Sequence, residues 1–150
     1  MKYTTNNEFQ NFEFSEVHVN DIMYANGSFK IGLDDVKILP ENSCNRDIRK
    51  MRANGLVLTL HDAEIITFVE EGYKIYDADG NLKKTEADVA VDEQDYKDVF
   101  ENFIDGNAYL IDKKDDEFNF VIDGINERTY SLTVKAAQDT EEWDKFLSLE

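Results

Sequence analysis

The segment from Val91 to Gly106 restricts the fold more than any other part of the sequence, because it carries the clearest helical pattern of the chain. Asp92 is suited to cap its first turn, and Gly106 to end its last turn in the left-handed conformation. An aromatic helix face of this length needs a sheet to pack on, so we expect helix 92–105 to cover a β-rich core. Its apolar residues recur at the spacing that puts them on one helix face, opposite the acids and Lys97: Tyr96, Val99, Phe100, Phe103 and Ile104.

Most of the remaining chain predicts β-strands. Apolar runs with turn signals between them indicate strands within an extended region over 12–24 and within 29–33, 56–60, 65–69, 73–76, 108–111, 118–122 and 130–134. A second short run spans 36–39, and a weaker strand leads up to Val91. Asn26-Gly27 predicts a tight hairpin. The apolar phase slips between Phe14 and Val17, which indicates a bulge or a break. Two more helices are expected, a short basic one within 41–54 and an amphipathic one over 139–147.

The expected fold class is therefore α+β, in which one antiparallel sheet or barrel of roughly 8–9 strands packs with two or three helices. A length of 150 residues suits one domain. Residues 1–10 are polar, and we expect them to form a loose N-terminal segment ahead of a single domain over 11–150. We note Leu149-Glu150 as a candidate cloning remnant.

The acidic composition limits the class of partner. Thirty-three acidic residues against 16 basic ones give a formal net charge of -17, which repels nucleic-acid phosphates and anionic lipid surfaces. We expect no direct nucleic-acid or membrane binding, whereas a protein partner with a basic surface would be attracted. The other interpretation is that the charge serves solubility alone. The N-terminus lacks an apolar signal segment, so we expect a cytoplasmic location.

The sequence lacks the usual motifs of enzyme and cofactor sites. Its seven glycines form neither a dinucleotide-binding nor a phosphate-loop motif. One cysteine and two scattered histidines do not provide the spacing of a zinc site. Cys44 lies beside Arg46, which would stabilise a thiolate, but no histidine belongs to a cysteine-enzyme signature, and a structural thiol is the favoured interpretation. We expect a non-enzymatic protein with no cofactor and no metal.

The segment Asp77-Ala78-Asp79-Gly80-Asn81 has a partial calcium-loop pattern, with oxygen ligands at alternate positions. Leu82 stands where the loop requires glycine, and Asp88 replaces the usual final glutamate. The flanking residues predict strands rather than helices. An ordinary Asp-Gly hairpin turn is therefore the favoured interpretation.

Two charged clusters are candidate binding sites. The acidic face of helix 92–105 is the candidate partner-binding surface, with Asp92, Glu93, Asp95, Asp98 and Glu101. The only basic cluster is a candidate site for an anion or for docking, with Arg46, Arg49, Lys50 and Arg52. Because acids surround these bases, internal charge balance is the favoured explanation of the basic cluster.

The C-terminal part of the chain resembles the end of a pleckstrin-homology domain, with a strand at Tyr130–Val134 followed by a Trp-bearing helix at Asp139–Leu147. The resemblance implies a pleckstrin-homology-like barrel as an alternative fold. Lipid-binding members of that family carry several basic residues around the first hairpin, where this chain has only Lys30. The resemblance therefore does not imply phosphoinositide binding.

The leading functional hypothesis is a non-enzymatic acidic protein-binding module, of the kind found in inhibitors and immunity proteins, that masks a basic surface of its partner. The alternative is a small-ligand-binding barrel or cup whose aromatic-lined pocket is closed by helix 92–105. An enzyme that uses carboxylates or Cys44 is the third class.

Overall fold

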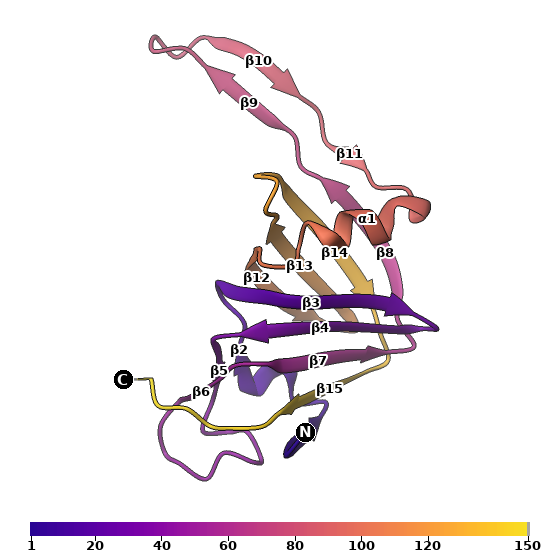
Figure 1. The fold of residues 1–150 in the computed structure, drawn as a ribbon. Helices are drawn as coiled ribbons and strands as arrows, with labels where there is room; N and C mark the ends of the chain where they lie inside the picture. Colours follow the sequence, from indigo (N-terminus) through magenta and orange to yellow (C-terminus); the bar gives the residue numbers. More distant parts are fainter. Residues whose placement is uncertain (150) are drawn as a thin grey trace.

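The computed structural model describes residues 1–149 and consists mostly of antiparallel β-strands (Figure 1). Strands account for 54% of the chain and helical residues for 8%. The predicted α+β class with two or three packed helices is therefore wrong, because the described residues contain one short α-helix and two 3-10 turns. The helical elements are η1 (Phe9–Asn11), η2 (Glu93–Asp95) and α1 (Tyr96–Glu101).

The strands follow one another closely along the chain. They are β1 (Tyr3–Asn6), β2 (Phe12–Glu13), β3 (Val17–Ala25), β4 (Ser28–Asp34), β5 (Val36–Ile38), β6 (Met51–Ala53), β7 (Leu56–His61), β8 (Glu64–Glu70), β9 (Tyr73–Tyr76), β10 (Leu82–Glu86), β11 (Val89–Ala90), β12 (Asn107–Lys114), β13 (Glu117–Asp123), β14 (Thr129–Lys135) and β15 (Gln138–Trp143). Ten of them form one sheet in the order β1-β15-β7-β4-β3-β12-β13-β14-β8-β11, β2-β5-β6 form a small sheet, and β9-β10 form a separate hairpin.

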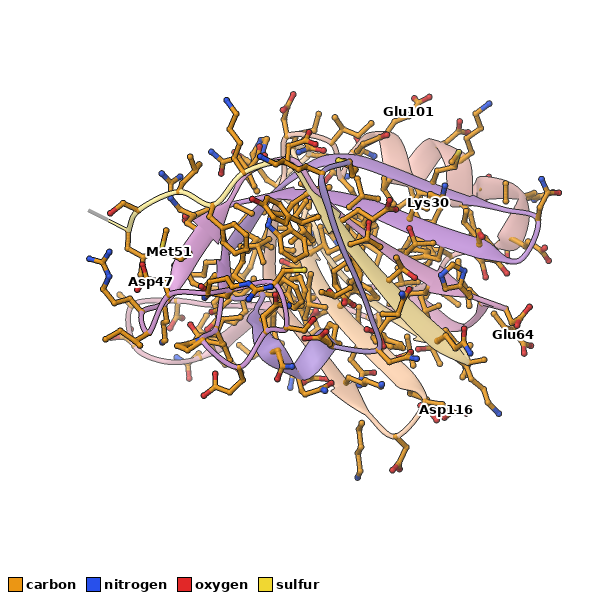
Figure 2. The ribbon with its side chains drawn as sticks, turned by 90° about the horizontal axis from the view of Figure 1, so that it is seen from below. Lys30, Asp47, Met51, Glu64, Glu101 and Asp116 are labelled. Carbon is orange, nitrogen blue, oxygen red and sulfur yellow. The ribbon has the colours of Figure 1, made fainter. Side chains whose placement is uncertain are left out.

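The ten-stranded sheet folds over on itself between β3 and β12. These two strands pair at only two positions, and Figure 1 shows β3, β4, β7 and β15 running across the steeper β12, β13, β14 and β8. The two halves of the sheet face each other, since the ring centroids of Phe29 on β4 and Phe120 on β13 lie 5.2 Å apart. Figure 2 shows side chains filling this space, while Glu64, Glu101 and Asp116 point outward.

Alternating burial explains why most of the predicted strands form where expected. In β14, for example, Tyr130, Leu132 and Val134 are buried and the residues between them are not, as a period of two requires. The predicted hairpin at Asn26-Gly27 is confirmed, with φ of 54° and 75° at the two residues. Both angles lie in the left-handed region that a type I′ turn needs.

The predicted helix over 92–105 is much shorter than expected. Its α-helical part spans only Tyr96–Glu101, and Asp92 makes no side-chain capping hydrogen bond. The left-handed residue at its end is Asp105, with φ of 69°, and its N–H donates to Val19 O at 2.7 Å. Gly106 instead allows close packing, because a Cβ there would collide with the backbone of Asp123 and Phe103. Tertiary contacts of this kind end the helix before its sequence pattern does.

The helix predicted over 139–147 is also wrong. Residues 138–143 form β15, in which Asp139, Glu141 and Trp143 are buried at alternate positions. β15 lies between β1 and β7 and pairs with both, so pairing on two sides overrides the helical spacing of the apolar residues. The pleckstrin-homology-like alternative rested on this helix and is not supported.

The short basic helix predicted within 41–54 does not form either. Residues 39–50 make an irregular loop that leads into β6. The side-chain amide of Asn45 fixes this loop, because its Nδ2 donates to the carbonyls of Ile38, Leu39 and Arg49 at 3.1–3.2 Å. Side chains that bond to nearby backbone in this way compete with helix formation.

The N-terminal segment is joined to the sheet. Residues 3–6 of the segment expected to be loose form the edge strand β1, which pairs with β15. Phe9 in η1 is buried and stacks on Phe14, with ring centroids 4.8 Å apart. Strand β1 and the buried ring of Phe9 thus attach this segment to the sheet and the core.

The β9-β10 hairpin, which we call the arm (residues 73–86), stands clear of the rest of the molecule (Figure 1). All residues of both strands are exposed. The calcium-like segment forms the tip, where Asp77 Oδ1 accepts hydrogen bonds from the N–H groups of Asp79 and Asn81, each at 2.9 Å. The hairpin-turn interpretation is confirmed, and no cluster of candidate metal ligands occurs in residues 1–149.

The base of the arm is tied to the main sheet through Arg128. Its guanidinium donates to Glu70 Oε2 at 3.1 Å and to Glu71 O at 3.2 Å, and it lies 5.0 Å from the centre of the Tyr73 ring. Tyr130 Oη also donates to Glu70, at 3.1 Å. These contacts fix the direction in which the arm leaves the sheet.

Gly72 is expected to be essential for the shape of the arm base. A Cβ at this position would overlap the backbone of Glu86 and Ala87 on the returning leg. Gly72→Ala should therefore push the two legs apart, at a cost of about 1–3 kcal/mol. We expect residues 73–86 to exchange amide hydrogens at least tenfold faster by mass spectrometry, with the sheet core unchanged. Thr85→Ala, which introduces no overlap, is the control, and equal exchange in both variants would contradict this account.

Candidate functional site

The acidic residues predicted as a partner-binding surface lie together on one short helical segment. Asp92 precedes η2, Glu93 and Asp95 belong to η2, and Asp98 and Glu101 belong to α1. All five are exposed, and none of them forms an ion pair with any residue between 1 and 149. This segment therefore presents unneutralised negative charge.

Beside these acids lies a hollow between α1 and the end of β3, with a volume of about 580 Å³. We call it the α1–β3 groove. Residues from the strand and from the helical segment line it: Ile22, Met23, Tyr24, Ala25, Glu93, Gln94, Tyr96, Lys97, Phe100, Glu101 and Ile104. Two of the five predicted acids, Glu93 and Glu101, thus belong to a concave site.

The groove combines an apolar floor with a polar rim. Ile22 and Phe100 are buried and provide the floor, and Met23 is 51% exposed at the edge. Burial and the carboxylates of Glu93 and Asp92 raise the pKa of Tyr96, so its phenol stays protonated and can donate a hydrogen bond at neutral pH. An apolar side chain that also bears a cation would find contacts for both of its parts here.

A shift of strand phase creates the β3 side of the groove. Val17 and Val19 are buried, but the register shifts between Val19 and Asp21, and Ile22 becomes the next buried residue. Met23 is consequently turned outward although it is apolar. Sequence analysis did not identify the β3 side of the groove. The sequence contains one indication of it, because the apolar residues Val17 and Val19 occupy odd positions and the next one, Ile22, occupies an even position.

Beneath α1, aromatic rings fill the core. Phe68 stacks on Phe100 at a centroid distance of 5.6 Å, and Phe103 meets Tyr130 at 5.2 Å. The helix is therefore packed on rings of β8 and β14, and the hollow lies at its side facing β3.

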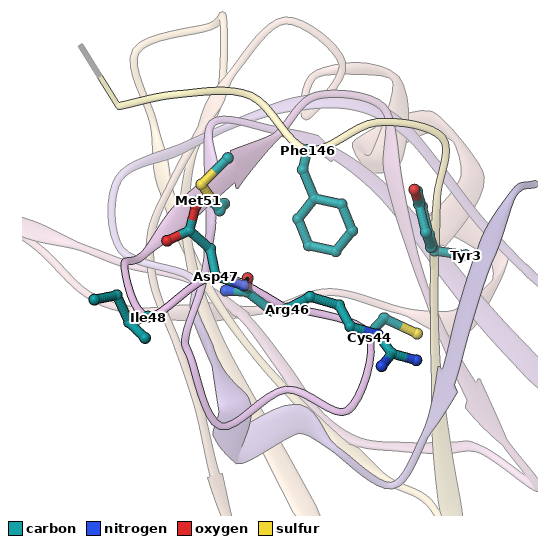
Figure 3. A pocket seen from close by; sticks show the side chains of 8 residues that line it. Tyr3, Cys44, Arg46, Asp47, Ile48, Met51 and Phe146 are labelled. Carbon is teal, nitrogen blue, oxygen red and sulfur yellow. Dashed lines mark hydrogen bonds between the residues drawn. The ribbon is translucent and has the colours of Figure 1, made fainter.

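The predicted basic cluster lies on the 39–50 loop and on β6, and Figure 3 shows its member Arg46. Arg49 pairs with Asp47 at 3.3 Å, Lys50 with Glu13 at 2.7 Å, and Arg52 with Asp35 at 3.8 Å. These three pairs agree with internal charge balance. Such exposed pairs contribute little to stability, but they leave Arg46 as the one member of the cluster without an ion pair among residues 1–149.

Cys44 and Arg46 line an open pocket of about 720 Å³ with Tyr3 and Phe146. Figure 3 shows the Phe146 ring pointing into this pocket. Cys44 Sγ lies 3.9 Å from Thr4 O, at the limit of a weak hydrogen bond. Neither histidine lines the pocket. Its acidic lining residue is Asp47, which pairs with Arg49.

A buried pair of acids on β15 was not predicted as a feature. Asp139 and Glu141 are fully buried. Asp139 forms an ion pair with Lys113 at 3.4 Å, and Thr5 Oγ1 donates to Glu141 Oε1 at 2.8 Å. Burial, together with the adjacent Asp139 carboxylate, raises the pKa of Glu141 to about 9. Glu141 is therefore protonated in the folded protein at neutral pH.

Comparisons with models of known protein families, with curated proteins and with solved structures found no match for this chain. Among residues 1–149, no helix has the length and apolar character needed to cross a membrane. The chemistry of the site is thus the basis for a functional proposal.

Proposed function

We propose that this protein is a non-enzymatic acidic protein-binding module, and that its α1–β3 groove takes a basic segment of the partner. The observation that carries the proposal is the apolar hollow beside five carboxylates that have no cationic neighbour within ion-pair distance. Lys97 also lines the groove, but Glu93, Glu101 and the three neighbouring carboxylates outnumber it. Net negative charge around a concave surface favours ligands of the opposite sign. The net charge of -17 extends this attraction beyond the groove.

The groove specifies the kind of segment it would take. An aliphatic or aromatic side chain fits against Ile22 and Phe100, and burying such a side chain contributes about 1.5–3 kcal/mol. Lysine or arginine residues on either side of it would face Glu93 and Glu101. These rim charges are expected to raise the association rate more than the final affinity.

The proposal predicts that Glu93→Lys/Glu101→Lys weakens binding of a synthetic peptide with alternating lysine and leucine residues. We expect at least a tenfold higher Kd, because both rim charges are reversed. Isothermal titration calorimetry measures the Kd, and stopped-flow fluorescence measures the association rate. For the unchanged protein, that rate should fall as salt is raised from about 0.05 to 0.5 M.

Glu64→Lys/Glu117→Lys is the matched control, since it changes the net charge equally at two exposed strand positions outside the groove. Equal losses in the two double variants would show that only the overall charge attracts the peptide. An association rate that does not depend on salt would remove the electrostatic part of the proposal.

A second candidate function is the binding of a small amphipathic cation in the same groove. A volume of about 580 Å³ falls within the range of small-molecule sites, and Tyr24, Tyr96 and Phe100 provide an aromatic lining. Native mass spectrometry of the protein from its own cells separates the two candidates. A bound small molecule that is lost in Ile22→Arg would support this candidate over the protein-binding one.

A further inference from the structure

The edge of β3 that borders the α1–β3 groove lacks a neighbouring strand. On this side β3 pairs with β12 at only two positions near its start. The last backbone contacts on this side are at Val19, whose N–H donates to Gly106 O at 3.0 Å and whose O accepts from Asp105 N–H at 2.7 Å. Residues 21–25 pair with β4 on the other side. Beyond Val19, the side of β3 that faces α1 is therefore an open sheet edge.

The residues that line the groove show that this edge of β3, rather than one of its faces, forms the wall. A strand face presents only alternate residues, whereas four consecutive residues of β3, 22–25, line the hollow. Figure 1 shows α1 on the side of β3 that faces away from β4. The groove thus runs along the open edge.

The turn at Asn26-Gly27 determines which backbone groups of β3 point into the groove. A two-residue turn is closed by a hydrogen-bonded pair, here Ala25 and Ser28. Bonded and non-bonded pairs alternate along antiparallel strands. The N–H and C=O groups of Ile22 and Tyr24 therefore point away from β4 and toward α1.

The hydrogen bonds of the two residues agree with this alternation. Ile22 N–H donates to the side chain of Asp21, at 2.9 Å from Oδ1, and not to β4. In the described part of the chain, no backbone hydrogen bond joins Ile22 or Tyr24 to α1 or β12. Backbone groups of this kind on a sheet edge are where an extended chain can add a further strand.

The charge beside the edge indicates what kind of chain would pair there. Residues 92–101 carry five acids and one base, Lys97, so their formal charge is -4. Glu93 and Glu101 lie on the groove itself. A basic segment is therefore favoured over an acidic one.

We propose that the basic segment of the partner binds in the α1–β3 groove as an additional antiparallel β-strand on the open edge of β3. The inference rests on the proposed function and adds the conformation of the bound segment. Antiparallel pairing is chosen because it is the more stable direction. The main-chain hydrogen bonds supply affinity, and the side chains supply specificity.

Strand pairing also defines the sequence pattern of the partner. Residues that lie opposite Ile22 and Tyr24 share the same face of the sheet as these two. Every second residue of the segment thus meets the apolar floor at Ile22 and Phe100, and the residues between them carry the cations. The partner sequence should alternate with the period of two of a strand, not with the 3.6-residue period of an amphipathic helix.

Amide exchange measured by NMR tests the pairing in the unchanged protein. With a saturating amount of the lysine–leucine peptide, the N–H of Tyr24 should exchange at least tenfold more slowly, because it then donates to the peptide. The N–H of Met23 is the internal control. It already points to β4, so its exchange should change much less.

Backbone methylation of the peptide provides an independent test. Leucines opposite Ile22 and Tyr24 direct their N–H groups to β3, whereas the lysine N–H groups point away from it. N-methylation of the leucine residues should therefore raise the Kd at least tenfold in isothermal titration calorimetry, since the main-chain bonds are lost. The peptide that is N-methylated at its lysine residues is the matched control and should bind like the unmodified one.

The outcomes separate this inference from the proposed function. Equal Kd values for the two methylated peptides, a loss confined to the lysine-methylated peptide, or peptide binding that leaves the exchange of Tyr24 unchanged would each overturn the antiparallel strand and retain the function. A lysine–leucine peptide that does not bind at all would overturn the proposed function, and the strand pairing with it.

Discussion

We expect the protein to lose stability between about pH 5 and pH 9, and we expect Glu141→Gln to remove most of this loss. The pKa of Glu141 is about 9 in the folded state, against an ordinary value of 4.5. The folded protein thus holds a proton that the unfolded chain releases above pH 4.5. The contribution of this group to stability is complete below that pH and is lost as pH rises to about 9, on the order of several kcal/mol.

Urea unfolding at about pH 5, 7 and 9 measures this effect through the change in the free energy of unfolding. Glutamine has the shape of the protonated acid and does not titrate, so the variant should lack this pH dependence. Glu142→Gln, on the opposite face of the same strand, is the control and should retain it. A free energy of unfolding that is constant from pH 5 to 9 in the unchanged protein would contradict a protonated Glu141.

Trp143→Ala is expected to lower the free energy of unfolding by about 3–5 kcal/mol. The indole is fully buried at the end of β15, and its ring centroid lies 5.5–5.7 Å from those of Tyr3, Phe12 and Phe146. The substitution leaves a cavity where strand β1, the small sheet and the C-terminal residues meet. Since Trp143 is the only tryptophan, far-UV circular dichroism should follow the unfolding.

Trp143→Phe distinguishes loss of ring volume from loss of the indole N–H. The Nε1 atom is buried and has no hydrogen-bond partner among the described residues, so removing it breaks no hydrogen bond. We expect this variant to lose less than half as much stability as Trp143→Ala. Equal losses in the two variants would mean that the indole nitrogen contributes an interaction that the structure does not show.

Local patterns were sufficient for the hairpins and for most individual strands. Asn26-Gly27 places two residues with positive φ where a two-residue turn needs them, and the alternation around Phe118–Ile122 marks one buried face. The break between Phe14 and Val17 was also predicted correctly, and Glu16 there has φ of 52°. In each case the determining interactions join residues close in sequence, which a local pattern contains.

Non-local pairing explains the elements that were predicted wrongly. Residues 139–147 have helical apolar spacing, but β15 is held by β1 and β7, whose residues are far away in the sequence. From the sequence alone, acidic residues such as Asp139 and Glu141 are expected to be exposed to solvent. In the structure they are buried, because Lys113 pairs with Asp139 and Thr5 donates a hydrogen bond to Glu141. Acids at core positions are stable only with such partners, and a single sequence does not contain that information.

The candidate site was predicted in part. Charge and helical spacing indicated the acids of 92–101, which the structure places together. The apolar floor depends on how β3 packs against α1, and the register shift that exposes Met23 depends on its pairing with β4. The arm was expected as strands and a turn, but its separation from the body is a property of the tertiary structure alone.

The place of β15 between β1 and β7 has a consequence for how the chain is made in the cell. Until residues 138–143 leave the ribosome, β15 cannot form. During this time β7 has only β4 as a neighbour and β1 has none. The backbone of β7, from Leu56 to Leu60, is then an unpaired strand edge. Such an edge can pair with other nascent chains. Closure of the sheet is thus a late event that links the two ends of the chain, and folding should be slow for a domain of this size.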